Sequence, residues 1–136
     1  MSHIENLTTR PDKLSDPVYV VTTVFNPIRF NSRWRLYNKF AHHVTTSGGI
    51  LYTVEVALGD REFSVTTSNN PCHLQLRSRE IIWHKERALN LIIHRLPANW
   101  KYLAWVDADV TFVRTDWINE IRHQLQVYDI LQPWKI

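Results

Sequence analysis

WKYLAWVDADVTFVR, residues 100 to 114, joins an apolar run to a pair of acidic residues. The run, Tyr102 to Val106, is short and rich in strand-forming residues, which is typical of a strand buried on both faces of a sheet. It stops at Asp107 and Asp109, with the small Ala108 between them. Open α/β sheets bind ligands at the carboxyl ends of their strands, so this acid pair lies where a ligand is expected.

The chemistry of the acid pair suits a divalent metal ion. Mg²⁺ and Mn²⁺ prefer oxygen ligands and usually take only one or two carboxylates, with water and substrate phosphate completing the shell. The pattern alone is weak, because acidic residues after a strand also form solvated turns or cap the next helix. The pair therefore indicates a metal site that a nucleoside diphosphate would complete, with a solvated turn as the alternative.

Length and composition limit the class of protein. The 136 residues are enough for one domain with a real core, and 44% hydrophobic with 21% charged residues is ordinary for a globular protein. No apolar run is long enough to cross a bilayer, and the N-terminus is too polar for a secretory signal, so we expect a cytoplasmic protein without a membrane span. The net charge of +3 is spread out, which argues against a nucleic-acid partner.

Cysteine and histidine offer no alternative metal site. The single Cys72 excludes an internal disulfide and a cysteine-based zinc site. The seven histidines show neither HExxH nor HxH spacing. Any metal is therefore expected at carboxylates.

The rest of the chain predicts strands that alternate with helices. After an irregular lead-in over residues 1–17, the pattern favours strands at 18–25, 50–58 and 102–106, shorter extended segments at 62–67, 73–77 and 129–134, and helices at about 31–46, at 79–95 and from 116. Asn31 or Ser32 would cap the first helix and Thr115 the last, and Gly48 with Gly49 would end the first.

This alternation predicts an α/β fold, with a mostly parallel layered sheet and helices on both faces. The helix between the first two strands makes them a parallel pair. The loops after Phe25, Val56 and Val106 then open on one edge of the sheet, where a ligand would lie.

Four segments in this order resemble a known family. VVTTVFNP, LYTVEVAL, WHKERALN and YLAWVDADVTF are similar to the donor-binding N-terminal half of nucleotide-sugar glycosyltransferases of the A-type (GT-A) fold, with the DxD motif at residues 107–109. The resemblance covers residues 18–134 and implies a Rossmann-like donor-binding domain over 18–136. The implied activity is metal-dependent transfer of a glycosyl group from a nucleotide-diphosphate sugar, a UDP-sugar first of all, to an unknown acceptor.

The resemblance also implies site residues. The nucleotide-sugar site would comprise Thr23, Phe25, Asn26, Glu55, Trp83, Lys85, Asn90 and Asp107, and Asp107 with Asp109 would hold Mn²⁺ or Mg²⁺. Asp60 competes with Glu55, and Arg77 and Arg79 are further candidates for phosphate contact. Phe25 could equally pack in the core, and a helical lysine such as Lys85 is often only a surface residue.

The sequence is also compatible with other functions. The resemblance ends before the half that carries the acceptor site and the catalytic base in A-type enzymes, so no catalytic residue is named. We expect either a piece of a longer enzyme, a short non-catalytic protein that binds the donor or has a structural role, or a chain completed by self-association or a partner at an open sheet edge. A metal-dependent nucleotidyl or phosphoryl transferase is a further alternative, although the chain has no GxxxxGK[ST] loop.

Overall fold

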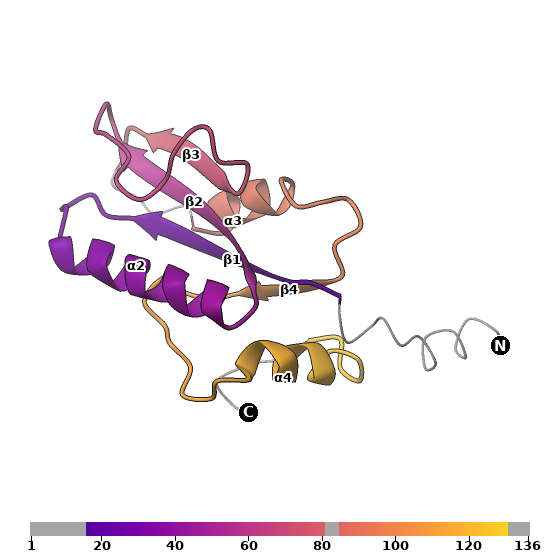
Figure 1. Cartoon of the computed structure of the whole chain (residues 1–136). Coiled ribbons are helices and arrows are strands. Elements are labelled where there is room, and N and C mark those ends of the chain that lie inside the picture. Colours follow the sequence, from indigo (N-terminus) through magenta and orange to yellow (C-terminus); the bar gives the residue numbers. More distant parts are fainter. Residues whose placement is uncertain (1–15, 81–84, 131–136) are drawn as a thin grey trace.

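The structure is a computed structural model that describes residues 16–80 and 85–130. Along these residues the elements are β1 (Val18–Phe25), α2 (Asn31–Thr46), β2 (Ile50–Leu58), β3 (His73–Ser78), α3 (Lys85–Ile93), β4 (Tyr102–Trp105) and α4 (Trp117–Gln124), as Figure 1 shows. The strands form one sheet in the order β3-β2-β1-β4, and every neighbouring pair is parallel. The predicted α/β class with a parallel sheet is therefore confirmed. None of the described helices is long and apolar enough to span a bilayer.

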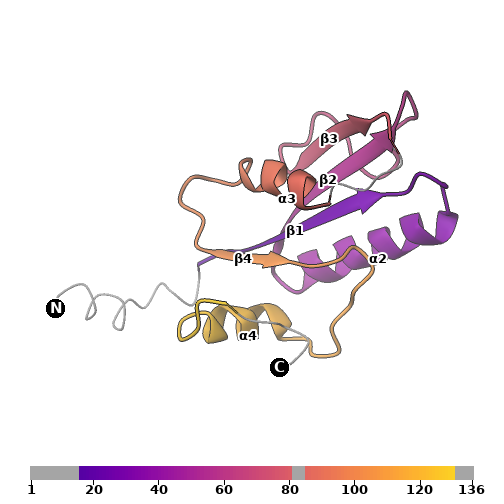
Figure 2. The same ribbon diagram turned by 180° about the vertical axis from the view of Figure 1, so that it is seen from behind.

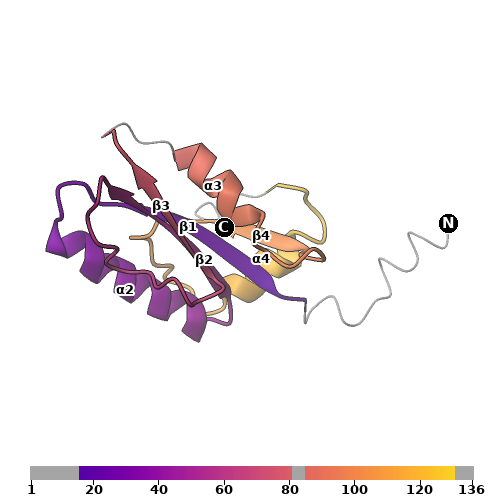
Figure 3. The ribbon, with the colours of Figure 1, turned by 90° about the horizontal axis from the view of Figure 1, so that it is seen from above.

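The central strand β1 supplies both faces of the core. Its even-numbered residues, among them Val20 and Val24, pack with buried residues of α2 and α4, whereas Tyr19 and Val21 pack with α3. Successive side chains of a strand point to opposite faces, so an unbroken apolar run is what a strand covered on both sides requires. Figures 2 and 3 show the result, with α2 and α4 on one face of the sheet and α3 on the other.

The end of α2 is set by two glycines, as predicted. Gly48 has a φ of 93°, a conformation that glycine adopts without strain. At Gly49 the chain passes close to the core, because an added Cβ would lie 3.0 Å from both Ile118 Cδ1 and Val44 Cγ1. The N–H of Gly49 donates to the carbonyl of Val44, which closes the last turn of the helix.

The predicted helix caps are wrong. Phe30, not Asn31 or Ser32, precedes the first turn of α2 and makes no side-chain cap. Asn26 fixes the turn before the helix instead, because its side chain accepts the N–H of Phe30 and donates to the carbonyl of the same residue. At α4 the cap position is Asp116 rather than Thr115, and the Asp116 carboxylate accepts two hydrogen bonds from Arg114 instead of capping the helix.

The segments around β3 also differ from expectation. Residues 62–67 were expected to form a strand, but they form an irregular loop, because the N–H groups of Ser64, Val65 and Thr66 bind a side chain from β2 rather than a neighbouring strand. The segment expected at 73–77 is instead a full strand, paired with β2 over six positions. The helix expected to start at 79 is not helical at Arg79 or Glu80, and its described part begins at Lys85.

The prediction that the apolar run of residues 102–106 is buried on both faces is wrong at one residue. β4 pairs only with β1 and forms an edge of the described sheet, and the Trp105 side chain is 44% exposed. Tyr102 and Ala104, on the face that packs against α2 and α4, are buried as expected. Of the strand expected at 129–134, Asp129 and Ile130 are not extended in a sheet, and the remainder lies outside the described residues.

Candidate functional site

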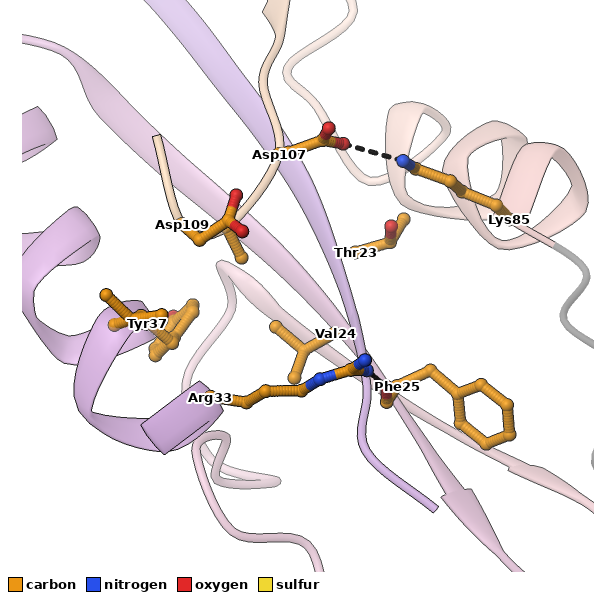
Figure 4. Close-up of a pocket in the computed structure, with 10 residues that line it drawn as sticks. Thr23, Val24, Phe25, Arg33, Tyr37, Lys85, Asp107 and Asp109 are labelled. Carbon is orange, nitrogen blue, oxygen red and sulfur yellow. Dashed lines mark hydrogen bonds and ion pairs between the residues drawn. The ribbon is translucent and has the colours of Figure 1, made fainter. Parts of the chain in front are cut away.

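A pocket opens at the carboxyl ends of β1 and β4. The chain adds β2 and β3 on one side of β1 and then returns to add β4 on the other side. The order in which strands are added therefore reverses between β1 and β4, although all strands are parallel. Open α/β sheets bind ligands at this reversal. The pocket there has a volume of about 280 Å³ and is lined by Thr23, Val24, Phe25, Arg33, Leu36, Tyr37, Lys85, Asp107, Ala108 and Asp109 (Figure 4).

The segment after β4 places both acidic residues on the solvent side. Ala108, Val110 and Phe112 pack against the core formed with α2 and α4, whereas the residues between them are exposed. Ala108 and Asp109 form a turn, in which the N–H of Val110 donates to the carbonyl of Asp107, and Asp107 and Asp109 both line the pocket. The spacing of two residues thus brings both carboxylates to the pocket while the residue between them anchors the segment.

The two carboxylates differ in their partners. Asp107 Oδ1 lies 2.6 Å from the Nζ of Lys85, and 58% of the Asp107 side chain is exposed. Within the described part of the chain, the Asp109 carboxylate has neither a hydrogen bond nor an ion pair. Asp109 is thus a negatively charged group without compensation at the wall of the pocket.

Two cationic side chains reach the pocket from opposite sides. Lys85 comes from the first turn of α3 and Arg33 from the first turn of α2, on either side of the end of β1 (Figure 4). The guanidinium of Arg33 donates one hydrogen bond, 3.2 Å long, to the carbonyl of Phe25. A guanidinium has five N–H donors, so most of the Arg33 donors remain for a ligand. The pocket therefore combines acidic and basic groups.

Arg33 and Tyr37 were not predicted as pocket residues. Arg33 could have been found, because the first turn of a helix that follows a parallel strand lies at the carboxyl edge of the sheet. Tyr37 could not, since its hydroxyl bonds to Thr53 Oγ1 at 2.7 Å only after α2 has docked on β2. Burial raises the pKa of Tyr37, against the hydrogen bond with Thr53, and the negative charge of Glu55 raises it further.

The acidic residues of the pocket fit a divalent cation that keeps most of its other ligands. In the described ranges, no three histidine, cysteine or acidic side chains are grouped so that they could hold a metal ion. Asp107 and Asp109 are two carboxylates that line the same pocket, and Mg²⁺ is commonly held by one or two carboxylates together with water and phosphate oxygens. The donor set suits such an ion in company with a phosphate ligand.

Several predicted site residues do not line the pocket. The side chain of Asn26 is used by the turn before α2, and Asn90 is exposed on α3. Arg77 donates to the carbonyls of Gly59 and Arg61. Asp60 and Arg79 are exposed and also absent from the pocket wall, and Trp83 lies outside the described residues. Of the predicted set, the pocket brings together Thr23, Phe25, Lys85, Asp107 and Asp109.

Glu55 has a structural place instead. It is 5% exposed, and its carboxylate accepts hydrogen bonds from the N–H groups of Ser64, Val65 and Thr66 and from the Thr66 hydroxyl. An ionised carboxylate can accept about four hydrogen bonds, so these four donors satisfy it. Glu55 therefore fixes the loop after β2, and it does not line the pocket.

His43 of α2 anchors the segment that carries the acid pair. The N–H of Phe112 donates to His43 Nε2 at 3.0 Å, and the imidazole stacks on Trp117 with ring centroids 5.4 Å apart. Burial lowers the pKa of His43, and the positive charge of Lys39 lowers it further. The neutral imidazole is the form that can accept this hydrogen bond.

We expect the free energy of unfolding to fall as the pH drops below about 6.5, the ordinary pKa of histidine in an unfolded chain. Because the pKa of folded His43 is lowered, the unfolded state binds more protons in this range, so the contribution of His43 is present above the unfolded pKa and lost on acidification. Burial also lowers the pKa of His73, which acts in the same direction. Urea unfolding at about pH 7.5 and about pH 5.5 measures the loss, and His43→Gln should lose less than the wild type. Equal losses in both proteins would contradict this account.

Comparison of the chain with protein-family models, with curated proteins and with solved structures finds no match.

Proposed function

We propose that this chain binds a nucleotide-diphosphate sugar in the pocket between β1 and β4 and is the donor-binding, Rossmann-like part of a metal-dependent glycosyltransferase of the A-type fold. The observation that supports the proposal is the position of Asp107 and Asp109 at the reversal of strand order, with Lys85 and Arg33 beside them. A diphosphate needs positive charge on both sides, and a divalent cation needs oxygen ligands. This pocket offers both within one small volume.

Each of these pocket residues would have its own role in binding the donor. Asp107 and Asp109 would hold Mn²⁺ or Mg²⁺, which when bound supplies positive charge to the departing diphosphate. Arg33 uses one N–H donor on the carbonyl of Phe25, and its remaining donors would stabilise charge on phosphate oxygens. Thr23 and Phe25, at the end of β1, would contact the nucleoside.

A donor-binding protein without catalysis is the second candidate. Asp107 and Asp109 of the described pocket are both assigned to the metal, so the contacts that this pocket supplies are those of binding, and turnover would need a group from outside it. Transfer of sugar to any acceptor would exclude this candidate. Release of sugar from the nucleotide, without an acceptor, would also show turnover.

Calorimetric titration with UDP, GDP and their sugar conjugates, each with and without Mn²⁺, tests the binding. We expect one nucleotide to bind only when the metal is present. Asp109→Asn should weaken metal-dependent binding about 30-fold, since a charged oxygen ligand is lost. The melting temperature should stay within about 2 °C, because Asp109 is exposed and has no partner in the described chain.

Asp60→Asn is the matched control. Asp60 is another exposed aspartate, in the turn that follows β2, and it does not line the pocket. This variant should bind the nucleotide as the wild type does. Absence of binding for every nucleotide in a folded sample would reject the proposed function, and a loss of stability in Asp109→Asn without a change in binding would reject the site.

A further inference from the structure

The ion pair between Lys85 and Asp107 has a geometry that bears on how the pocket accepts a metal. Lys85 Nζ lies 2.6 Å from Asp107 Oδ1 and 5.3 Å from the centroid of the Trp105 ring. A carboxylate and an aromatic face both attract a cation. The ammonium group therefore lies beside one of the two carboxylates that a metal would need.

We propose that Lys85 acts as an internal cation that keeps free divalent metal from Asp107, so that the pocket takes up its metal together with a diphosphate. This inference rests on the proposed function. A metal ion that arrives alone meets the positive charge of Lys85 and finds only Asp109 without a partner. A metal that arrives with a diphosphate brings phosphate oxygens, which give Lys85 a new partner when it leaves Asp107.

The exchange is feasible because the pair is partly exposed. The Lys85 and Asp107 side chains are 34% and 58% exposed, and ion pairs of this kind are weak. Lysine is also suited to the movement, since its ammonium is a point charge on a flexible chain rather than a rigid fork. Lys85 lines the pocket, so it need not leave the pocket to change partner. Its role is to pair with Asp107 before the ligand binds and with phosphate oxygens when the ligand is bound.

Lys85→Gln tests this role by two measurements with opposite expected signs. Without nucleotide, Lys85→Gln should bind Mn²⁺ about fivefold more tightly than the wild type, because the competing charge is gone. The loss of the electron paramagnetic resonance signal of free Mn²⁺ measures this binding. Binding of UDP in the presence of Mn²⁺ should become about tenfold weaker, because a charge-assisted contact to phosphate is lost. Lys85→Arg keeps the charge and should leave Mn²⁺ binding without nucleotide close to the wild-type value.

Lys101→Gln is the matched control at the opposite end of β4. Lys101 Nζ pairs with Asp16 at 3.2 Å, lies 6.0 Å from the Tyr102 ring centroid, and has a side chain 32% exposed. It shares the chemistry of Lys85 but does not line the pocket. Both affinities of this variant should lie within about twofold of the wild type, which is the size of an ordinary surface change.

The outcomes separate this inference from the proposed function. Mn²⁺-dependent UDP binding by the wild type, with unchanged or weaker affinity of Lys85→Gln for Mn²⁺ alone, would overturn the role of Lys85 and leave the function standing. Failure of the wild type to bind any nucleotide would overturn the function. In that case the Mn²⁺ titration alone still decides whether Lys85 competes with metal, and tighter binding by Lys101→Gln would show that the effect is not specific.

Discussion

Replacing Phe40 with alanine is expected to lower the free energy of unfolding by about 3–5 kcal/mol. Phe40 is 0% exposed and belongs to the core cluster that joins α2 to β1 and α4, together with Val20, Val44 and Ile118. Removal of its ring leaves a cavity on the face of the sheet where two helices meet, and α2 carries Arg33 and Tyr37 of the pocket. Urea unfolding followed by far-ultraviolet circular dichroism measures the change.

Trp105→Ala is the comparison for this experiment. The tryptophan side chain is larger, but Trp105 is 44% exposed on an edge strand, so its loss should cost only about 2 kcal/mol. A cost equal to that of Phe40→Ala would mean that Trp105 is covered in solution, by a further part of the protein or by another chain. A small cost for both variants would contradict the assignment of the core.

The central part of the fold could be predicted because local and long-range preferences agree there. β1 is an unbroken apolar run, α2 carries apolar residues at helical spacing, and Gly48 with Gly49 ends it. Each feature favours the same structure before any tertiary contact forms. The parallel pairing of β1 with β2 then follows from the helix between them.

The errors lie where a tertiary contact overrides the local pattern. Glu62 to Thr67 has strand-forming residues, but Glu55 from β2 takes the N–H groups that a strand would need. Asn26 binds the backbone of Phe30, the residue before α2, and Trp105 is exposed on β4, which has a described neighbour, β1, on one side only. The spacing of these residues in the sequence does not predict the tertiary contacts that they make.

Asp107, Asp109 and Lys85 of the pocket were among the predicted site residues, whereas Arg33 was not. Asp107 and Asp109 follow a recognisable strand, so the edge to which they belong is set by the parallel topology. Arg33 and Lys85 lie on different helices, and only the packing of α2 and α3 on opposite faces brings them to one pocket. The ion pair between Lys85 and Asp107 joins residues 22 positions apart, and no sequence pattern predicts it.

Glu55→Ala is expected to lower the free energy of unfolding by about 3–4 kcal/mol. Three N–H groups and one hydroxyl of residues 64–66 lose their acceptor, and each unpaired buried donor is costly, although water can reach the partly buried ones. Glu55→Gln should cost about half as much. Its carbonyl oxygen can replace Oε1 for Val65 and Thr66, but its amide group then faces the N–H of Ser64, which bonds to Oε2 in the wild type.

Nucleotide binding by the same two variants distinguishes a structural Glu55 from a ligand-binding one. Because Glu55 is 5% exposed and does not line the pocket, a folded sample of Glu55→Gln should bind nucleotide with Mn²⁺ as tightly as the wild type does. A residue that held the base or ribose would behave in the opposite way, with stability unchanged and binding lost. The titration is made at a temperature where both proteins are fully folded, so that a loss of stability does not appear as a loss of binding. Binding should then be unchanged, because the loop held by Glu55 lies apart from the acid pair in sequence and in the sheet.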